Sequence, residues 1–120
     1  MSRSQRQRSG DFAEQRALRL LRSRGWLLLA RQWRCRWGEL DLVMAKPGRL
    51  LLVEVKGRRS PAAKARSDGL GWQKRARLRR AWACWIADHP ALAERPVELV
   101  AALVPLPPAA GPVRWIRLHA

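Results

Sequence analysis

Three carboxylates lie close together in a chain that has only nine acidic residues. They are Glu39, Asp41 and Glu54, and Lys56 follows the last of them by two positions. Their neighbours are apolar, so charged groups interrupt segments that otherwise suit strands. Carboxylate oxygens are hard ligands that suit magnesium or manganese, ions that keep several waters and readily contact a phosphate oxygen. The pattern therefore predicts a divalent-metal site for phosphodiester chemistry.

Each group has a plausible task in that chemistry. A bound metal stabilises charge on the scissile phosphate and makes a coordinated water easier to deprotonate. The ammonium of Lys56 is suited to position that water or to stabilise the transition state. The alternative is a weak surface ion pair between Glu54 and Lys56, with the other carboxylates merely solvated. The combination of G-E-x-D, a turn and V-E-V-K is more specific than E-x-K alone and favours the site.

The strand that carries the first two carboxylates should alternate between two faces, because successive side chains on a strand point to opposite sides. This period places Glu39 and Asp41 on one face and Leu40 and Leu42 on the other. The same rule places the glutamate and the lysine of V-E-V-K together on the next strand.

Two consecutive segments are expected to form an antiparallel hairpin. They are Gly38–Met44 and Leu50–Lys56, and Lys46-Pro47-Gly48 between them is typical of a tight turn. Antiparallel pairing predicts that Asp41 lies beside Glu54 on a shared face. Two facing carboxylates repel, so either a cation neutralises them or they project into water.

The other segments predict two helices, three further strands and a loop. These are a helix over Asp11–Arg24, a strand over Trp26–Trp33, a loop over Gly57–Gly71, a helix over Trp72–His89, and strands over Pro96–Val104 and Val113–Leu118, the last at a sheet edge. The order α-β-β-β-α-β-β predicts an α/β fold in which helices flank a mixed sheet.

Most of the seven tryptophans are interpreted as packing groups. Trp26, Trp33, Trp82 and Trp85 are expected in the core or at its margin. Trp37 and Trp72 lie near the predicted site, where an indole can also stack on a base. Packing is favoured for these two as well.

The length of 120 residues predicts one domain, with a basic flexible N-terminus over 1–9 and the folded unit over 10–120. No apolar run is long enough to cross a bilayer, and no secretory signal is recognised. Cys35 and Cys84 are far apart and form no C-x-x-C pair, which suits a reducing compartment. We therefore expect a cytoplasmic protein that does not act at a membrane.

Charge is the strongest global feature, because 25 lysines and arginines stand against nine acidic residues and give a net charge of +16. A solvated basic surface or attraction to anionic lipid would also explain it. Nucleic acid is favoured because the basic residues extend along the whole chain. The residues predicted to contact phosphates are Arg58, Arg59, Lys64 and Arg66 after the site, and Arg75, Arg79 and Arg80 on the second helix.

Four segments together resemble a known family. They are G-D-F-A-E-Q-R-A from Gly10, Gly25-Trp26, R-C-R-W-G-E-L-D-L-V from Arg34 and L-V-E-V-K-G-R from Leu52. These residues resemble the YraN family of small bacterial proteins, over about residues 10 to 104. That family is similar to the archaeal Holliday junction resolvases of the PD-(D/E)XK, or restriction-endonuclease-like, superfamily.

The resemblance implies roles for individual residues. It makes Asp41 and Glu54 metal ligands, with the carbonyl of Val55 as a further ligand and Lys56 as the catalytic lysine. Glu14, on the first helix, matches an acidic residue that such resolvases bring to the metal or its water.

Three more residues are implied as supporting groups. Glu39 belongs to the G-E-x-D signature and would stand behind the ligands. Gln73 or Lys74, which open the second helix, fall where the superfamily often has another polar site residue.

The first hypothesis is therefore a magnesium- or manganese-dependent endonuclease that hydrolyses DNA, including branched or junction DNA. Resolvase-like enzymes commonly act as homodimers, because cutting paired strands needs two sites. The alternative is a non-catalytic nucleic-acid-binding module on the same fold, an accessory factor in recombination, repair or DNA uptake. A third hypothesis, a structural basic protein associated with ribosomes, leaves the row of carboxylates unexplained. DNA is favoured over RNA as the partner.

Overall fold

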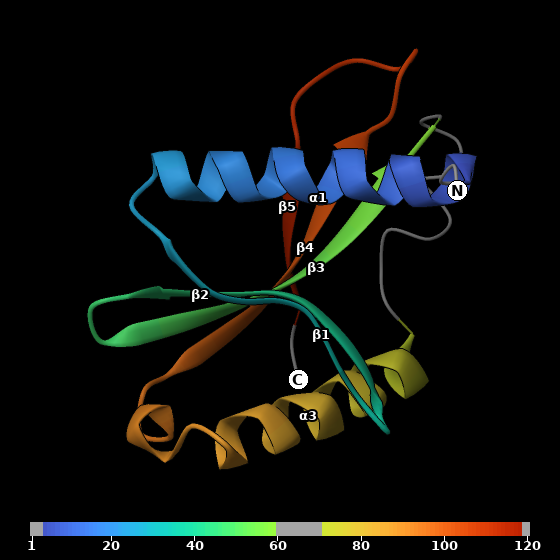
Figure 1. The fold of residues 1–120 in the computed structure, drawn as a ribbon. Coiled ribbons are helices and arrows are strands. Elements are labelled where there is room, and N and C mark those ends of the chain that lie inside the picture. The colour runs from blue at the N-terminus through green and yellow to red at the C-terminus, as the bar shows by residue number, and fades with distance from the viewer. Residues whose placement is uncertain (1–3, 60–70, 119–120) are drawn as a thin grey trace.

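A computed structural model describes residues 4–59 and 71–118 and shows one five-stranded sheet between two helices (Figure 1). The elements are α1 (Gln5–Ser23), β1 (Leu27–Cys35), β2 (Gly38–Lys46), β3 (Arg49–Arg58), α3 (Trp72–Ala87), the short 3-10 helix η1 (Pro90–Leu92), β4 (Val97–Pro105) and β5 (Arg114–Leu118). The predicted α/β class and the order α-β-β-β-α-β-β of a restriction-endonuclease-like core are confirmed.

The sheet has the spatial order β1-β2-β3-β4-β5 and is mixed. β1, β2 and β3 pair antiparallel, as do β4 and β5, whereas β3 and β4 are parallel. Antiparallel neighbours need only short turns, but parallel neighbours need a crossover, which α3 supplies here. The predicted hairpin is confirmed, with Lys46 opposite Arg49 beside its turn. β5 is an edge strand, as predicted.

α1 begins at Gln5 and not at the predicted Asp11. Residues 5–9, which we predicted as part of a flexible N-terminus, form its first turns. The reason is a capping box: Ser4 Oγ accepts a hydrogen bond from the Gln7 amide at 3.1 Å, and Gln7 Oε1 accepts one from the Ser4 amide at 2.9 Å. Because the apolar periodicity starts only at Phe12, it concealed this earlier start.

Two hydrophobic clusters hold the helices on opposite faces of the sheet. On the α1 side, Leu18 and Leu21 pack with Met44 and Val53, among others. On the α3 side, the members include Leu40, Val43, Leu52, Leu78, Ala81 and Trp85. Each cluster removes apolar side chains from water and fixes one helix relative to the strands that carry the carboxylates.

The tryptophans pack largely as predicted. Trp85 is buried, and Trp26, Trp33 and Trp82 are half-buried beside the two clusters. The first strand starts one residue later than predicted and extends to Cys35. Among the described residues, no helix is long and apolar enough to span a membrane.

Candidate metal and nucleic-acid site

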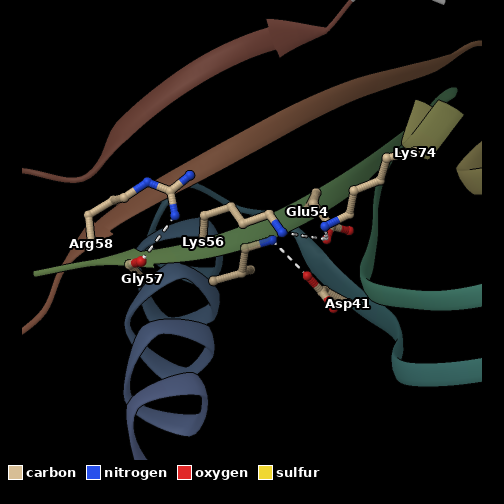
Figure 2. A network of polar contacts seen from close by, with 7 residues as sticks. Asp41, Glu54, Lys56, Gly57, Arg58 and Lys74 are labelled. Atoms are coloured by element: carbon tan, nitrogen blue, oxygen red, sulfur yellow. Dashed lines mark hydrogen bonds and ion pairs between the residues drawn. The ribbon is translucent and has the colours of Figure 1, made fainter. Parts of the chain in front are cut away.

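Asp41 lies where β2 separates from β3. The pairing of the two strands at this end stops at Leu42 opposite Val53. Beyond that pair, Asp41 Oδ2 accepts a hydrogen bond from the backbone amide of Val55 at 2.7 Å (Figure 2). The carboxylate thus takes the place of a strand carbonyl, which fixes its position beside β3.

The simple alternation predicted for this strand is wrong. Leu40 belongs to the cluster under α3 and Leu42 to the cluster under α1, so they do not share a face. On the neighbouring strand β1, Gln32 adopts a left-handed conformation with φ of 49°, between the residues that pair with these two leucines. The strand pair is therefore irregular at Asp41. Irregular strand geometry of this kind re-aims side chains.

Glu54 is the buried centre of the site, with only 7% of its surface exposed. Its Oε1 lies 3.8 Å from Lys56 Nζ and 3.6 Å from Lys74 Nζ, and Figure 2 shows the two lysines converging on it. The predicted grouping of Glu54 with Lys56 is confirmed. Of the two residues proposed at the start of the second helix, Lys74 contacts the site, whereas Gln73 is exposed.

The electrostatics of the two carboxylates are unfavourable. Burial, reinforced by the charge of Glu54, raises the pKa of Asp41 to about 7, against the lowering effect of its hydrogen bond from Val55. Burial also raises the pKa of Glu54, although Lys74 and Lys56 oppose the shift. Asp41 and Glu54 are therefore close enough to disfavour simultaneous ionisation. Such a pair is neutralised by a proton or by a cation.

Lys56 also departs from ordinary behaviour. Its burial and its contact with Lys74 lower its pKa, against the attraction of Glu54 and Asp41. A second ammonium beside it makes protonation less favourable than in water. Perturbed acid and base groups that face one another are typical of sites that do chemistry.

The donor set fits magnesium or manganese. Asp41 and Glu54 offer hard carboxylate oxygens, and Val55, whose carbonyl we predicted as a further ligand, lies between Glu54 and Lys56 on β3. Within the described ranges, no group of three His, Cys, Asp or Glu residues is placed to hold a metal. Magnesium commonly binds through one or two carboxylates and completes its shell with water and substrate phosphate. Zinc, which favours nitrogen and sulfur ligands, fits less well.

Glu14 projects from α1 into the same region but is fully engaged by other side chains. Its Oε1 accepts a hydrogen bond from Arg31 Nε at 3.0 Å and forms an ion pair with Arg31 Nη2 at 2.8 Å, and its Oε2 accepts a hydrogen bond from Gln32 Nε2 at 3.1 Å. It lines a hollow of about 540 Å³, together with Asp41 and Glu39. The structure thus brings Glu14 to the site, and its role at a metal stays a prediction.

Glu39 links two parts of the site. It lines the hollow that contains Asp41 and also a smaller hollow, of about 180 Å³, that contains Glu54 and Lys74. Arg34 Nε donates a hydrogen bond to its Oε2 at 2.6 Å. This position suits the supporting role that we predicted, because its charge also raises the pKa of Asp41.

A basic hollow of about 630 Å³ lies between the end of β3 and the start of α1, on the side of Lys56 away from Lys74. Four cationic residues line it, with no acidic residue among its described lining: Arg6, Lys56, Arg58 and Arg59. Arg58 belongs to β3 and not to the predicted loop, and Arg59 donates a hydrogen bond to Ser9 Oγ at 2.8 Å. Sequence reasoning missed Arg6, because the S-x-x-Q capping signal that places it in α1 was not used.

Basic residues of α3 border the site on its opposite side. Arg77 lines the smaller hollow with Glu54, although we did not predict it. Arg80 lies 4.9 Å from the centre of the Trp37 ring, and Arg36 lies 4.8 Å from it. Trp37 is therefore engaged by two guanidinium groups in the folded chain.

The remaining predicted contacts are more dispersed. Arg79 is exposed and lines a different groove, on the face of the sheet that α3 covers. Arg75 is half-buried. The packing favoured for Trp72 is wrong, because this first residue of α3 is 74% exposed. Lys64 and Arg66 lie outside the described residues.

Comparison with known proteins identifies the family. The model of the uncharacterised protein family UPF0102 matches residues 13–102, which include both carboxylates, Lys56 and the basic helix. The chain belongs to the UPF0102 family. The predicted resemblance to YraN proteins is thereby confirmed.

Relatives within UPF0102 match most of the chain. A UPF0102 protein of Prochlorococcus marinus strain MIT 9303 is 52% identical over 112 residues, which cover 92% of this chain and 89% of the relative. One from Frankia alni is 42% identical, with 88% of this chain and 86% of the relative covered. One from Bordetella avium is also 42% identical, with 93% and 74% covered. These names state no activity, so function is argued from the site.

Proposed function

We propose that this UPF0102 protein is a metal-dependent endonuclease that hydrolyses phosphodiester bonds in DNA, with branched or junction DNA as its substrate. The observation that carries the proposal is the Asp41–Glu54 pair, whose two pKa values are raised, next to the ammonium of Lys56. A cluster of this kind costs folding free energy and is explained if a divalent cation completes it.

Each residue has a defined task in the proposed reaction. Asp41 and Glu54, with the carbonyl of Val55, would hold magnesium or manganese. When bound, that ion would supply Lewis-acid stabilisation of the phosphate and a more acidic water. Lys56 would orient the attacking water or stabilise negative charge on the phosphate, for which its partly buried position is suited. The carboxylate of Glu39 would support the position of Asp41 beside the cation.

The basic hollows suit a phosphate backbone. Arg6, Arg58 and Arg59 on one side of Lys56, and Lys74 and Arg77 on the other, can contact phosphates on either side of the scissile one. Such contacts position a strand without reading its sequence. The preference for DNA and for junctions rests on the resemblance to resolvases, as does a homodimer that cuts two strands. A cytoplasmic location rests on the two widely separated cysteines, which suit a reducing compartment.

A second candidate is a nucleic-acid-binding module that does not cleave, an accessory factor in recombination, repair or DNA uptake. The contacts of two glutamates favour it. Glu14 is occupied by Arg31 and Gln32, and Glu54 is already contacted by two lysines. In this case the ammonium groups, and not a metal, would balance the buried glutamate.

A cleavage assay separates the two candidates. Linear, flapped and four-way-junction DNA are incubated with magnesium or manganese and with the wild type, Asp41→Asn, Lys56→Ala or Glu94→Gln. Asn can still accept the hydrogen bond from Val55, and exposed Glu94 serves as a matched control for purification and charge. We expect metal-dependent cutting by the wild type and Glu94→Gln only. Absence of cutting by all four proteins, with salt-sensitive DNA binding intact, would support the binding module.

A further inference from the structure

A separate groove of about 510 Å³ lies toward the start of β3, whereas the carboxylate site lies toward the end of that strand. In Figure 1 the β2–β3 turn and η1 mark this side of the molecule, away from the N-terminal ends of α1 and α3. Most of its lining is apolar, and this apolar floor includes Leu50, Leu52, Leu78, Trp82, Val97 and Leu99. The groove has no part in the proposed nuclease chemistry.

The groove exists because α3 covers the sheet unevenly. α3 packs against β1 and β2, and the same face of β4 and β5 has less helix over it. Leu99 and Ile116 on those strands are consequently only half-buried, and Val97 is 42% exposed. Contiguous exposed apolar surface with a polar rim is typical of an interaction site.

The rim of the groove is positively charged. Arg49, Arg79 and Arg117 line it, and the acidic residue among its described lining is Glu98. Glu98 Oε1 accepts a hydrogen bond from Arg117 Nε at 3.1 Å, so these two charges offset each other and Arg49 and Arg79 give the rim its positive charge. The Arg49 guanidinium lies 4.9 Å from the centre of the Trp26 ring, which also lines the groove.

We propose that this groove binds an acidic peptide segment of a partner protein, one with apolar side chains between its carboxylates. The apolar side chains would enter the floor, and the carboxylates would meet the arginines of the rim. A second copy of this chain fits less well, because it brings a net charge of +16 to a basic rim. A nucleic-acid strand matches the rim, but its polar base edges would lie against leucine and valine side chains.

Binding of a labelled synthetic peptide tests the proposal by fluorescence anisotropy. The probe alternates Asp with Leu and Phe, and the control peptide keeps each Asp but replaces the apolar residues by Ser. We expect a Kd of roughly 10 µM for the probe and at least about tenfold weaker binding of the control. Arg49→Glu and Val97→Asp, both at exposed positions, should each weaken the probe at least about tenfold.

Arg19→Glu provides the matched control, because Arg19 is exposed on α1 and lies outside the groove. This substitution changes the net charge by the same amount as Arg49→Glu. It should bind the probe as the wild type does. In case a groove variant folds poorly, the indole N–H resonances of Trp26 and Trp82 are followed in the wild type. Both should shift when the probe is added.

Several results would overturn the proposal. Equal binding of the two peptides would mean that charge alone is recognised. The same would follow if Arg19→Glu weakened binding of the probe as much as Arg49→Glu. Unchanged resonances of both indoles would place the peptide elsewhere. Displacement of the probe by single-stranded DNA that shifts the same indoles at lower concentration would assign the groove to nucleic acid. A dimer in sedimentation equilibrium that Val97→Asp dissociates would assign it to a second copy.

Discussion

Two glutamates are the buried charged side chains of the described chain, and they are held very differently. Glu14 is 5% exposed and Glu54 is 7% exposed. Glu14 receives three contacts of 2.8 to 3.1 Å from Arg31 and Gln32. Glu54 has two ammonium groups at 3.6 and 3.8 Å and lies beside Asp41, whose pKa is raised by burial and by the charge of Glu54.

The difference distinguishes a carboxylate that is fully compensated within the fold from one whose compensation is incomplete. A buried charge is tolerable when short hydrogen bonds and an opposite charge compensate it, as at Glu14, which ties α1 to β1. Glu54 is contacted by two lysines at 3.6 and 3.8 Å and has a second carboxylate, Asp41, beside it, and burial still raises its pKa. Unrelieved electrostatic cost of this kind is characteristic of functional sites, where a ligand completes the compensation.

The largest expected effect is on cleavage. Glu54→Gln should lower the metal-dependent cleavage rate by at least about 1000-fold, because it removes a ligand charge at the reacting centre. Glu14→Gln should lower it less than about tenfold if Glu14 is structural. Single-turnover cleavage of junction DNA measures both. An equal loss in both variants would break the comparison and place Glu14 among the groups that act on the metal or its water.

The next effect concerns stability. Arg31→Met should lower the free energy of unfolding by about 2–3 kcal/mol, because it leaves Glu14 buried without its cation. The matched control is Arg34→Met, which removes an exposed contact to Glu39 and should cost less than about 1 kcal/mol. Urea unfolding followed by tryptophan fluorescence gives both values. Similar losses in the two variants would show that Glu14 does not depend on this compensation.

In metal-free protein, neutralising Asp41 and neutralising Glu14 should change the free energy of unfolding in opposite directions. Asp41→Asn should raise the free energy of unfolding by about 1 kcal/mol near neutral pH, because it removes repulsion and keeps the hydrogen bond from Val55. Glu14→Gln should lower it by about 1–2 kcal/mol, because the charged partner Arg31 loses its carboxylate. Destabilisation by Asp41→Asn would mean that the site is not strained.

The smallest effect is a pH dependence of stability without metal. Folded Asp41 retains its proton to about pH 7, whereas unfolded aspartate releases it near its ordinary pKa of 3.8. The stabilising contribution is therefore complete below about pH 4 and is lost as the pH rises to about 7. Asp41→Asn should flatten this slope in urea titrations across the window. An unchanged slope would assign the dependence to other groups.

Much of this architecture followed from local patterns. The Lys46-Pro47-Gly48 turn predicted the hairpin, and the apolar segments predicted the succession of strands along the chain and the second helix. The G-E-x-D and V-E-V-K signals brought the carboxylates and Lys56 together as predicted.

Two of the missed features depend on contacts between distant segments, and the third depends on a local helix cap. The break in alternation at Asp41 accompanies the left-handed Gln32 on a different strand, which no spacing within β2 reveals. The partners of Glu14 come from β1, seventeen or eighteen residues away, so its compensation was invisible to periodicity. Arg6 reached the basic hollow only because α1 starts early.

Manganese binding measured by isothermal titration calorimetry tests the central claim most directly. At about pH 8, where Asp41 is ionised, the wild type should bind one ion per chain, and Glu14→Gln should do the same. Asp41→Asn and Glu54→Gln should lose this binding. Manganese binding that persists in Glu54→Gln, or is absent from a folded wild type, would contradict the assignment of this pair as the metal site.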